Sequence, residues 1–187
     1  MEQMNGQRRW TRLLVFRALI TAIYLVLTLI FAPIAYGSVQ FRVSEALMVL
    51  PAITAAGVWG VTLGCFLANL LNPGNLGPID IIFGTLATFL AALLTRYMAL
   101  RLKPKMEQIS WKSPKLYLLP LPTVILNAVI VGSYLPFLLL EKQSTGIVLA
   151  SMLSVGLGEV GVLYLLGLPL LFALLKVGRS SRVTLPE

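Results

Sequence analysis

The chain has 187 residues, of which 58% are hydrophobic and 12% are charged, and its mean hydropathy is +0.88. This composition excludes an ordinary soluble domain and predicts an all-α integral membrane protein, folded as a single membrane-embedded domain over residues 1–187. The formal net charge of +8 would favour nucleic acid as a partner of a soluble protein. Here the basic residues gather near helix ends, where orientation in a lipid bilayer explains them. We therefore expect the bilayer, and no nucleic acid, as a partner.

Several residue types that common chemistries need are scarce or absent. The chain has no histidine and a single cysteine, Cys65. It therefore lacks the commonest general base and the commonest transition-metal ligand, and it cannot form an internal disulfide. It also has no GxxxxGK[ST] motif, so it cannot hydrolyse ATP itself. We expect no enzyme activity, no cofactor and no metal site, and any ATP-driven role would require partner subunits.

The apolar segments predict the helices in chain order. The first helix, over residues 11–32, lacks a cleavage site and is expected to be retained in the protein. The apolar run over residues 46–71 is interrupted by Gly57 and Gly60 around Trp59, so it forms either one tilted span or two short helices, over residues 44–56 and 58–71. Three further helices are expected over residues 79–100, 116–140 and 144–176.

The distribution of basic residues decides between these two topologies. Two short helices give six transmembrane helices with both termini cytoplasmic. That topology puts 13 of the 15 basic residues inside and leaves only Arg42 and Lys142 outside. A single span over residues 46–71 would leave only five inside, so we predict six spans. The inner residues are Arg8, Arg9, Arg12, Arg17, Arg96, Arg101, Lys103, Lys105, Lys112, Lys115, Lys176, Arg179 and Arg182.

Four polar residues flank the two short helices on the predicted outer side: Arg42, Glu45, Asn69 and Asp80. Irregular backbone at membrane depth is tolerated where it lines a cavity, so we expect these residues to line a ligand pocket. Simpler roles stay open for three of them. Glu45 can form a local ion pair with Arg42, Asp80 can cap the helix that follows Pro78, and Asn69 can cap the helix that it ends. Ser44 is expected to cap the helix that opens at Glu45.

Two further polar residues, Asn127 and Glu159, lie deep in the last two predicted helices. An ionisable group at such a depth costs roughly 2.5–3.5 kcal/mol on insertion scales, and it normally faces a cavity or a partner. Glu159 is flanked by glycines that allow close packing or close approach of a ligand. It can contact a ligand, pair with Arg42 or relay protons.

The first helix carries a small-xxx-small pattern, Ala18 to Ala22, which lets another helix approach closely.

Aromatic residues are expected in two settings. Trp10 and Trp59 suit the cytoplasmic aromatic belt. Four others lie on the outer side, where they can stack on a planar ligand or simply pack: Tyr36, Phe41, Phe83 and Tyr134.

Three motifs carry a resemblance to a known family: RVSEALMVLP at residues 42–51, GCFLAN at 64–69 and DxxxGTLAT at 80–88, with the Gly-Glu pair at 158–159. The chain resembles the substrate-binding (S) components of energy-coupling factor (ECF) transporters, specifically the queuosine-precursor transporter family, QueT. The resemblance implies a bundle of six helices with an outward-facing pocket, in the bacterial plasma membrane. It implies a deazaguanine base or queuine as substrate. It also implies a transmembrane coupling subunit, which meets Ala18 and Ala22, and two ATPase subunits as partners.

The polar residues suit such a substrate, because a guanine-like edge presents adjacent N–H donors to a carboxylate and an acceptor oxygen to an amide or guanidinium group. Glu159, Glu45 and Asp80 supply the carboxylates, and Asn127, Asn69 and Arg42 supply the donors. Other functions stay open: an S component for another vitamin, a stand-alone ion- or proton-coupled permease, or an intramembrane enzyme that uses the three carboxylates as acid and base groups.

Overall fold

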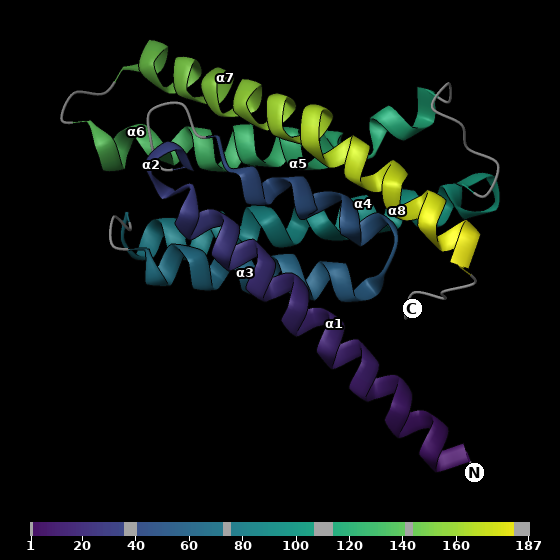
Figure 1. Cartoon of the computed structure of the whole chain (residues 1–187). Helices are drawn as coiled ribbons and strands as arrows, with labels where there is room; N and C mark the ends of the chain where they lie inside the picture. The colour runs from purple at the N-terminus through teal and green to yellow at the C-terminus, as the bar shows by residue number, and fades with distance from the viewer. Residues whose placement is uncertain (1, 36–40, 73–75, 107–113, 141–143, 182–187) are drawn as a thin grey trace.

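The computed structural model describes residues 2–35, 41–72, 76–106, 114–140 and 144–181, and every regular element in these ranges is a helix. The helices run alternately between the two ends of an elongated bundle (Figure 1). They are α1 (Glu2–Ile30), α2 (Ala32–Ala35), η1 (Val43–Ala52), α3 (Ala55–Leu71), η2 (Asp80–Gly84), α4 (Thr85–Met106), η3 (Pro114–Leu118), α5 (Leu121–Leu126), η4 (Asn127–Val131), α6 (Gly132–Leu139), α7 (Thr145–Val162), η5 (Leu163–Gly167) and α8 (Leu168–Ser181). Tyr36, Lys112, Lys142 and Arg182 lie outside the described residues, as do the side chains of Arg8, Arg9, Lys103, Lys105 and Arg179.

Four helical stretches of the described chain are long and apolar enough to cross a membrane: Trp10–Ile30, Asp80–Leu102, Pro114–Leu139 and Thr145–Val177. Val43–Ala52 and Ala55–Leu71 are shorter apolar helices. The all-α membrane class is therefore confirmed. At ~2.0 Å per residue for a 3₁₀ helix and ~1.5 Å for an α-helix, the two shorter helices reach about 20 and 26 Å, less than a hydrocarbon core near 30 Å. The count of six spans and the cytoplasmic termini stay predictions.

The break between the two short helices lies earlier than predicted. Thr54 is extended (φ −143°, ψ 143°), and its hydroxyl accepts a hydrogen bond from the amide of Ala56, so it caps α3. The prediction of a turn at Gly57 and Gly60 is wrong, because both glycines lie inside α3. They serve packing instead. A methyl group on Gly57 would lie 2.6 Å from the backbone of Leu50 and Pro51 in η1.

The long predicted helices exist, but the structure divides three of them. The helix predicted over 79–100 consists of η2 and α4. The helix predicted over 116–140 consists of η3, α5, η4 and α6, while α7, η5 and α8 form the one predicted over 144–176. The segments η2, η4 and η5 are π-helical and η1 is a 3₁₀ helix of ten residues. Runs of 3₁₀ helix longer than three or four residues are uncommon, and π segments occur frequently at functional sites.

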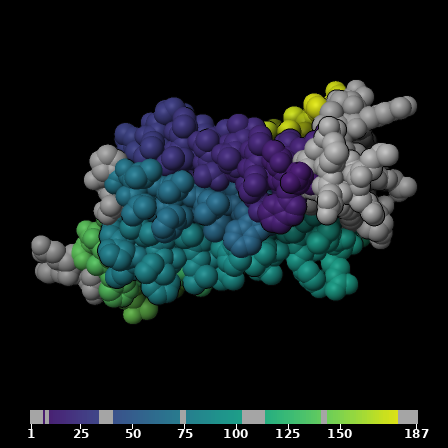
Figure 2. All heavy atoms as spheres, turned by 90° about the horizontal axis from the view of Figure 1, so that it is seen from below, coloured from purple at the N-terminus to yellow at the C-terminus, as the bar shows by residue number. Residues whose placement is uncertain are grey.

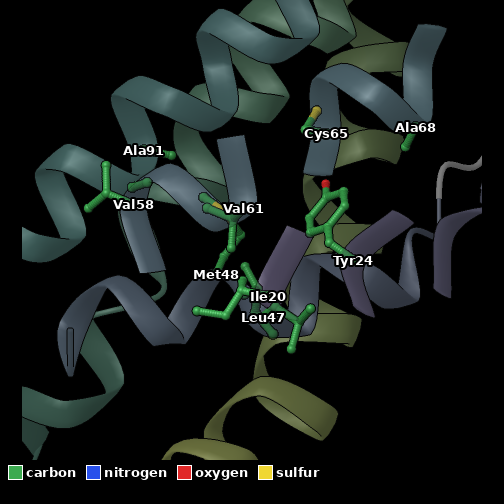
Figure 3. Packing of buried hydrophobic residues seen from close by; sticks show 11 residues of the cluster. Ile20, Tyr24, Leu47, Met48, Val58, Val61, Cys65, Ala68 and Ala91 are labelled. Carbon is green, nitrogen blue, oxygen red and sulfur yellow. The ribbon is translucent and has the colours of Figure 1, made fainter. Parts of the chain in front are cut away.

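The largest apolar cluster lies where α1 crosses α3 over η1 (Figure 3). Ile20 and Tyr24 point from α1 toward α3 one turn apart. Methyl groups on Gly60 and Gly64 would lie 2.6 Å from the Cβ atoms of Ile20 and Tyr24 respectively. Small residues at a helix interface let two backbones approach closely. These two glycines therefore set how closely α1 packs on α3, and α1 in turn covers η1.

Candidate functional site

All six polar residues predicted for the pocket are buried inside the bundle. Their exposed fractions are 5% for Arg42, 0% for Glu45, Asn69 and Asp80, 4% for Asn127 and 5% for Glu159. Three of the six lie on irregular helices, and a fourth directly precedes one. Arg42 precedes η1 and Glu45 lies in its first turn, whereas Asp80 and Asn127 are the first residues of η2 and η4. The irregular segments therefore coincide with the polar region.

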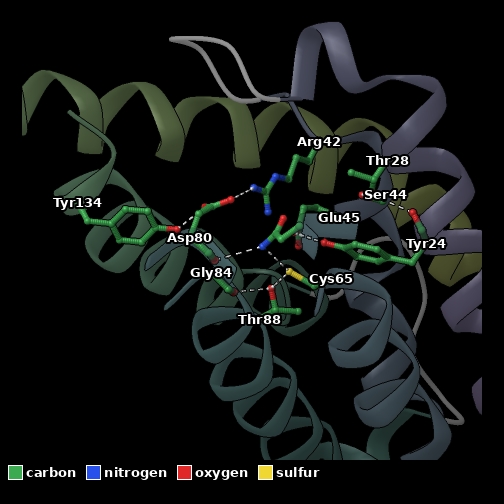
Figure 4. Close-up of polar contacts among 11 residues, drawn as sticks. Tyr24, Thr28, Arg42, Ser44, Glu45, Cys65, Asp80, Gly84, Thr88 and Tyr134 are labelled. Carbon is green, nitrogen blue, oxygen red and sulfur yellow. Dashed lines mark hydrogen bonds and ion pairs between the residues drawn. The ribbon is translucent and has the colours of Figure 1, made fainter. Parts of the chain in front are cut away.

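Asp80 lies at the centre of the first group of polar side chains (Figure 4). Its Oδ2 is 3.9 Å from Nη2 of Arg42, and its Oδ1 accepts a 2.7 Å hydrogen bond from the hydroxyl of Tyr134. The Asn69 amide donates to the backbone oxygen of Asp80 at 3.3 Å. The capping roles that the sequence left open for Asp80 and Asn69 are not found. The Asp80 side chain points to Arg42 and Tyr134, and the C-cap position of α3 is Asn72.

Glu45 is held by helix α1. The hydroxyl of Tyr24 donates to Glu45 Oε1 at 2.5 Å, and one turn further along α1 the hydroxyl of Thr28 donates to Ser44 Oγ at 2.7 Å. Ser44 therefore lies inside η1 and bonds to α1, and its predicted role as an N-cap is wrong. The residue at that position is Arg42, which makes no side-chain capping bond.

Cys65, a residue of α3, lies beside the group that contains Asp80 and Asn69. Its Sγ is 3.2 Å from the Thr88 hydroxyl and 3.7 Å from the Asn69 amide nitrogen, and Thr88 also donates to the backbone oxygen of Gly84. The cysteine is free and fully buried. It thus packs as a small residue while its sulfur faces hydrogen-bond donors.

Asn127 and Glu159 form a second polar group. The Asn127 amide donates to Glu159 Oε1 at 2.7 Å, and this bond links η4 to α7. Glu159 also interacts electrostatically with Glu45 and Arg42. Phe41 lies against α7, because a methyl group on Gly161 would be 3.2 Å from its ring. The two polar groups therefore belong to one buried region.

Each of the three carboxylates accepts a hydrogen bond at one oxygen and has no hydrogen-bond partner for the other among the described residues, although that other oxygen of Asp80 is ion-paired with Arg42. The three buried oxygens are Glu45 Oε2, Asp80 Oδ2 and Glu159 Oε2. Buried polar atoms are rarely left in this way, because an unpaired one costs roughly 1–3 kcal/mol and more if it is charged. An ionised carboxylate accepts hydrogen bonds but cannot donate them. The region is therefore suited to a ligand that offers several N–H donors.

Sequence reasoning missed Tyr24, Thr28 and Thr88, which position these groups. A tyrosine or threonine within an apolar helix carries no local signal of the carboxylate or hydroxyl that it will meet across a helix crossing. Tyr134 was predicted as a ring that could stack or pack. Its ring lies 6.3 Å from that of Phe83, and its hydroxyl is the part that reaches the site. Among the described residues, no group of three His, Cys, Asp or Glu side chains could hold a metal ion.

Ala18 and Ala22 lie on the opposite side of α1 from Tyr24. Both are exposed, and they line a groove of about 480 Å³ between α1 and α3, together with Arg17, Thr21 and Trp59. Figure 2 shows α1 running alongside α3 on this face of the molecule. One exposed aromatic ring lines the groove: Trp59 is 48% exposed, and it packs on the half-buried Phe89 with ring centroids 5.9 Å apart. A helix could approach α1 closely here.

Sequence comparisons identify the family to which the chain belongs. Residues 14–176 match the family described as QueT transporter. The chain belongs to the QueT transporter family. A QueT protein of Lactococcus lactis subsp. cremoris (strain MG1363), called queuosine precursor transporter, is 36% identical over 73 residues. That match covers 38% of this chain and 41% of the relative. No solved structure gives a significant match.

The family match confirms the resemblance seen in the sequence motifs. A transporter family and several long apolar helices together make this QueT member a multi-pass protein of the cell membrane. The motifs at 42–51, 64–69 and 80–88 fall on η1, α3 and η2 with the start of α4. These elements carry the first polar group.

Proposed function

We propose that the chain is the substrate-binding subunit of an ECF-type importer for a queuosine precursor, a deazaguanine base or queuine. The observation that supports this proposal best is that Glu45 and Glu159 each bury one carboxylate oxygen that has no hydrogen-bond partner among the described residues, beside an Asp80 oxygen that meets only the Arg42 guanidinium at 3.9 Å. The Lactococcus relative is called a queuosine precursor transporter. A deazaguanine offers the kind of N–H donors that such oxygens require.

The guanine-like edge is assigned to Glu159 and Asn127. One carboxylate can accept hydrogen bonds from the ring N–H and the exocyclic amine, which lie side by side. Asn127 holds the carboxylate through its NH₂ group, and its amide oxygen and second N–H can meet further groups of the base. Arg42 and Asn69, at the Asp80 side, are the donors assigned to the acceptor atoms of the ligand.

Transport is assigned to a complex rather than to this chain alone. The sequence has no nucleotide-binding loop, so the energy must come from ATPase subunits through a transmembrane coupling subunit. The exposed pair Ala18 and Ala22 is the proposed contact with that subunit, since small residues in the lining of the groove would let a helix approach closely. ATP hydrolysis by the complex would then release the bound substrate on the inner side of the membrane.

A binding titration tests the assignment. The purified chain should bind 7-aminomethyl-7-deazaguanine without ATP, and Glu159→Gln should weaken binding by at least about tenfold, ~1.4 kcal/mol. The amide supplies one acceptor instead of two and loses the charge that makes such bonds roughly twice as strong. Stability without ligand should change little, because the desolvation cost of the charge is removed as well.

The control variant is Ser151→Ala, on the same helix but facing a groove between α6 and α7. It should bind as the unmodified chain does. Unchanged affinity of Glu159→Gln with a large loss of stability would show that Glu159 is structural. Proton-driven uptake by the chain alone in vesicles would replace the proposal with a stand-alone permease.

A further inference from the structure

The buried polar region has more acidic than basic groups. It contains three of the seven acidic residues of the chain, whereas Arg42 is the one basic side chain that is buried in the described part. With all groups ionised, the region therefore carries an excess of two negative charges. Uncompensated charge in a low-dielectric interior is unfavourable, so charges there are paired or neutralised.

Arg42 carries one positive charge and cannot balance three carboxylates at once. Its guanidinium forms an ion pair with Asp80, and a single positive charge leaves Glu45 and Glu159 to repel one another. A positive charge bound close to them would offset this repulsion.

Of Glu45 and Glu159, Glu45 is the better placed to bind a positively charged group of a ligand. Tyr24 fixes its Oε1 at 2.5 Å, and Oε2 is buried without a hydrogen-bond partner among the described residues. Tyr24 is itself fully buried and packs against Gly64. The carboxylate is therefore held in one orientation, and its second oxygen is available to a ligand.

We propose that the site selects a cationic ligand, in which Glu45 binds a protonated amine while Glu159 and Asn127 bind the neutral edge of the base. This inference rests on the proposed function and narrows its substrate class. An aminomethyl deazaguanine fits, as does a queuine-type base with its secondary amine. A nitrile at the same position is neutral and donates no hydrogen bond, so it leaves Glu45 Oε2 unpaired.

The rival explanation is that protons, not a ligand, neutralise the carboxylates. A protonated Glu45 is neutral and can donate a hydrogen bond, so it would bind a ligand with a nitrile about as well as one with an amine. The two explanations therefore predict different ligand preferences.

The experiment is calorimetric titration of the full purified chain with three ligands that share one bicyclic base: 7-aminomethyl-, 7-cyano- and 7-methyl-7-deazaguanine. The aminomethyl compound should bind at least about tenfold more tightly than either neutral compound, since charge-assisted hydrogen bonds are roughly twice as strong as neutral ones. Glu45→Gln should reduce this preference to about threefold or less. Asn127→Ala should weaken all three ligands by similar factors.

The outcomes separate this inference from the function on which it rests. Equal affinity for the aminomethyl and neutral compounds would overturn the cationic-ligand inference and leave the proposed function standing. Binding of none of the three would overturn both. Because the ligand series on the unmodified chain decides the question, the result does not depend on Glu45→Gln folding.

Discussion

Gly84 is the residue at which η2 ends, and it leaves the space that the Asp80 group occupies (Figure 4). A methyl group there would lie 3.0 Å from Nδ2 of Asn69 and 3.2 Å from the hydroxyl of Tyr134. Both side chains hydrogen-bond to Asp80. A small residue is thus required by the polar contacts rather than by the backbone conformation.

Gly84→Ala should lower ligand affinity by about threefold to tenfold with little change in thermal stability. The methyl group must displace Asn69 or Tyr134 by a few tenths of an ångström, which loosens Asp80. The gain in helix propensity, up to about 1 kcal/mol, offsets the strain. Titration with the aminomethyl deazaguanine and thermal unfolding without ligand measure the two effects.

The matched control is Gly146→Ala in the first turn of α7. A methyl group at Gly146 meets only Ser144 Oγ, at 3.8 Å, so it gains the same propensity without touching the site. Its affinity should equal that of the unmodified chain. If Gly84→Ala also bound normally, the Asp80 group would not contribute to ligand binding.

For individual residues, the sequence predicts which polar and charged side chains lie in the buried region but not which hydrogen bonds position them. Asn127 and Glu159 could be identified because polar groups at membrane depth need partners, and they are found bonded to each other. The N-cap reading of Ser44 was wrong because its hydroxyl meets Thr28, a residue 16 positions earlier. Such a contact depends on how α1 crosses η1, which no local pattern encodes.

At the scale of elements, the crossing of α1 and α3 positions Tyr24 on Glu45. Gly60 and Gly64 are four residues apart on one face of α3, and Ile20 and Tyr24 pack against them. From the sequence alone, the natural interpretation of glycine in this region is a helix break. The interpretation failed because glycine serves close helix contact as readily as it ends a helix, and Thr54 supplied the actual start of α3.

Gly64→Ala should destabilise the protein by about 1–3 kcal/mol, the usual cost of overpacking. Its methyl group would lie 2.6 Å from Cβ and 2.9 Å from Cγ of Tyr24. The backbone of α1 must therefore move away, because Cβ cannot rotate out of the contact. Thermal unfolding in detergent should show a midpoint lowered by roughly 2–12 °C.

Gly156→Ala provides the graded comparison on α7. Its methyl group would meet Ala128 Cβ at 3.3 Å, which small shifts can relieve, so its unfolding midpoint should fall by less. Equal midpoints for Gly64→Ala and the unmodified chain would mean that α1 can pack on α3 without this close contact.

At the scale of the whole molecule, α1 connects two functions. Its buried side carries Tyr24 and Thr28, which bond to Glu45 and Ser44. Its exposed side carries Ala18 and Ala22 in the groove beside α3. The buried contacts to η1 and the proposed coupling surface are thus formed by different residues of one helix, so a substitution of an exposed residue can leave the buried contacts intact.

Ala18→Leu or Ala22→Leu should therefore abolish uptake by the complete importer while ligand affinity stays within about twofold of the unmodified chain. A leucine side chain would fill the groove and keep a partner helix at a distance, whereas neither alanine contacts the buried carboxylates. The measurement is uptake of labelled aminomethyl deazaguanine into vesicles that contain this chain with coupling and ATPase subunits, beside titration of the isolated chain.

Val26→Leu is the matched control, because Val26 is 51% exposed on α1 but does not line the groove. Loss of binding together with uptake would show that the outer face of α1 shapes the substrate site, and normal uptake by both alanine variants would place the coupling surface elsewhere.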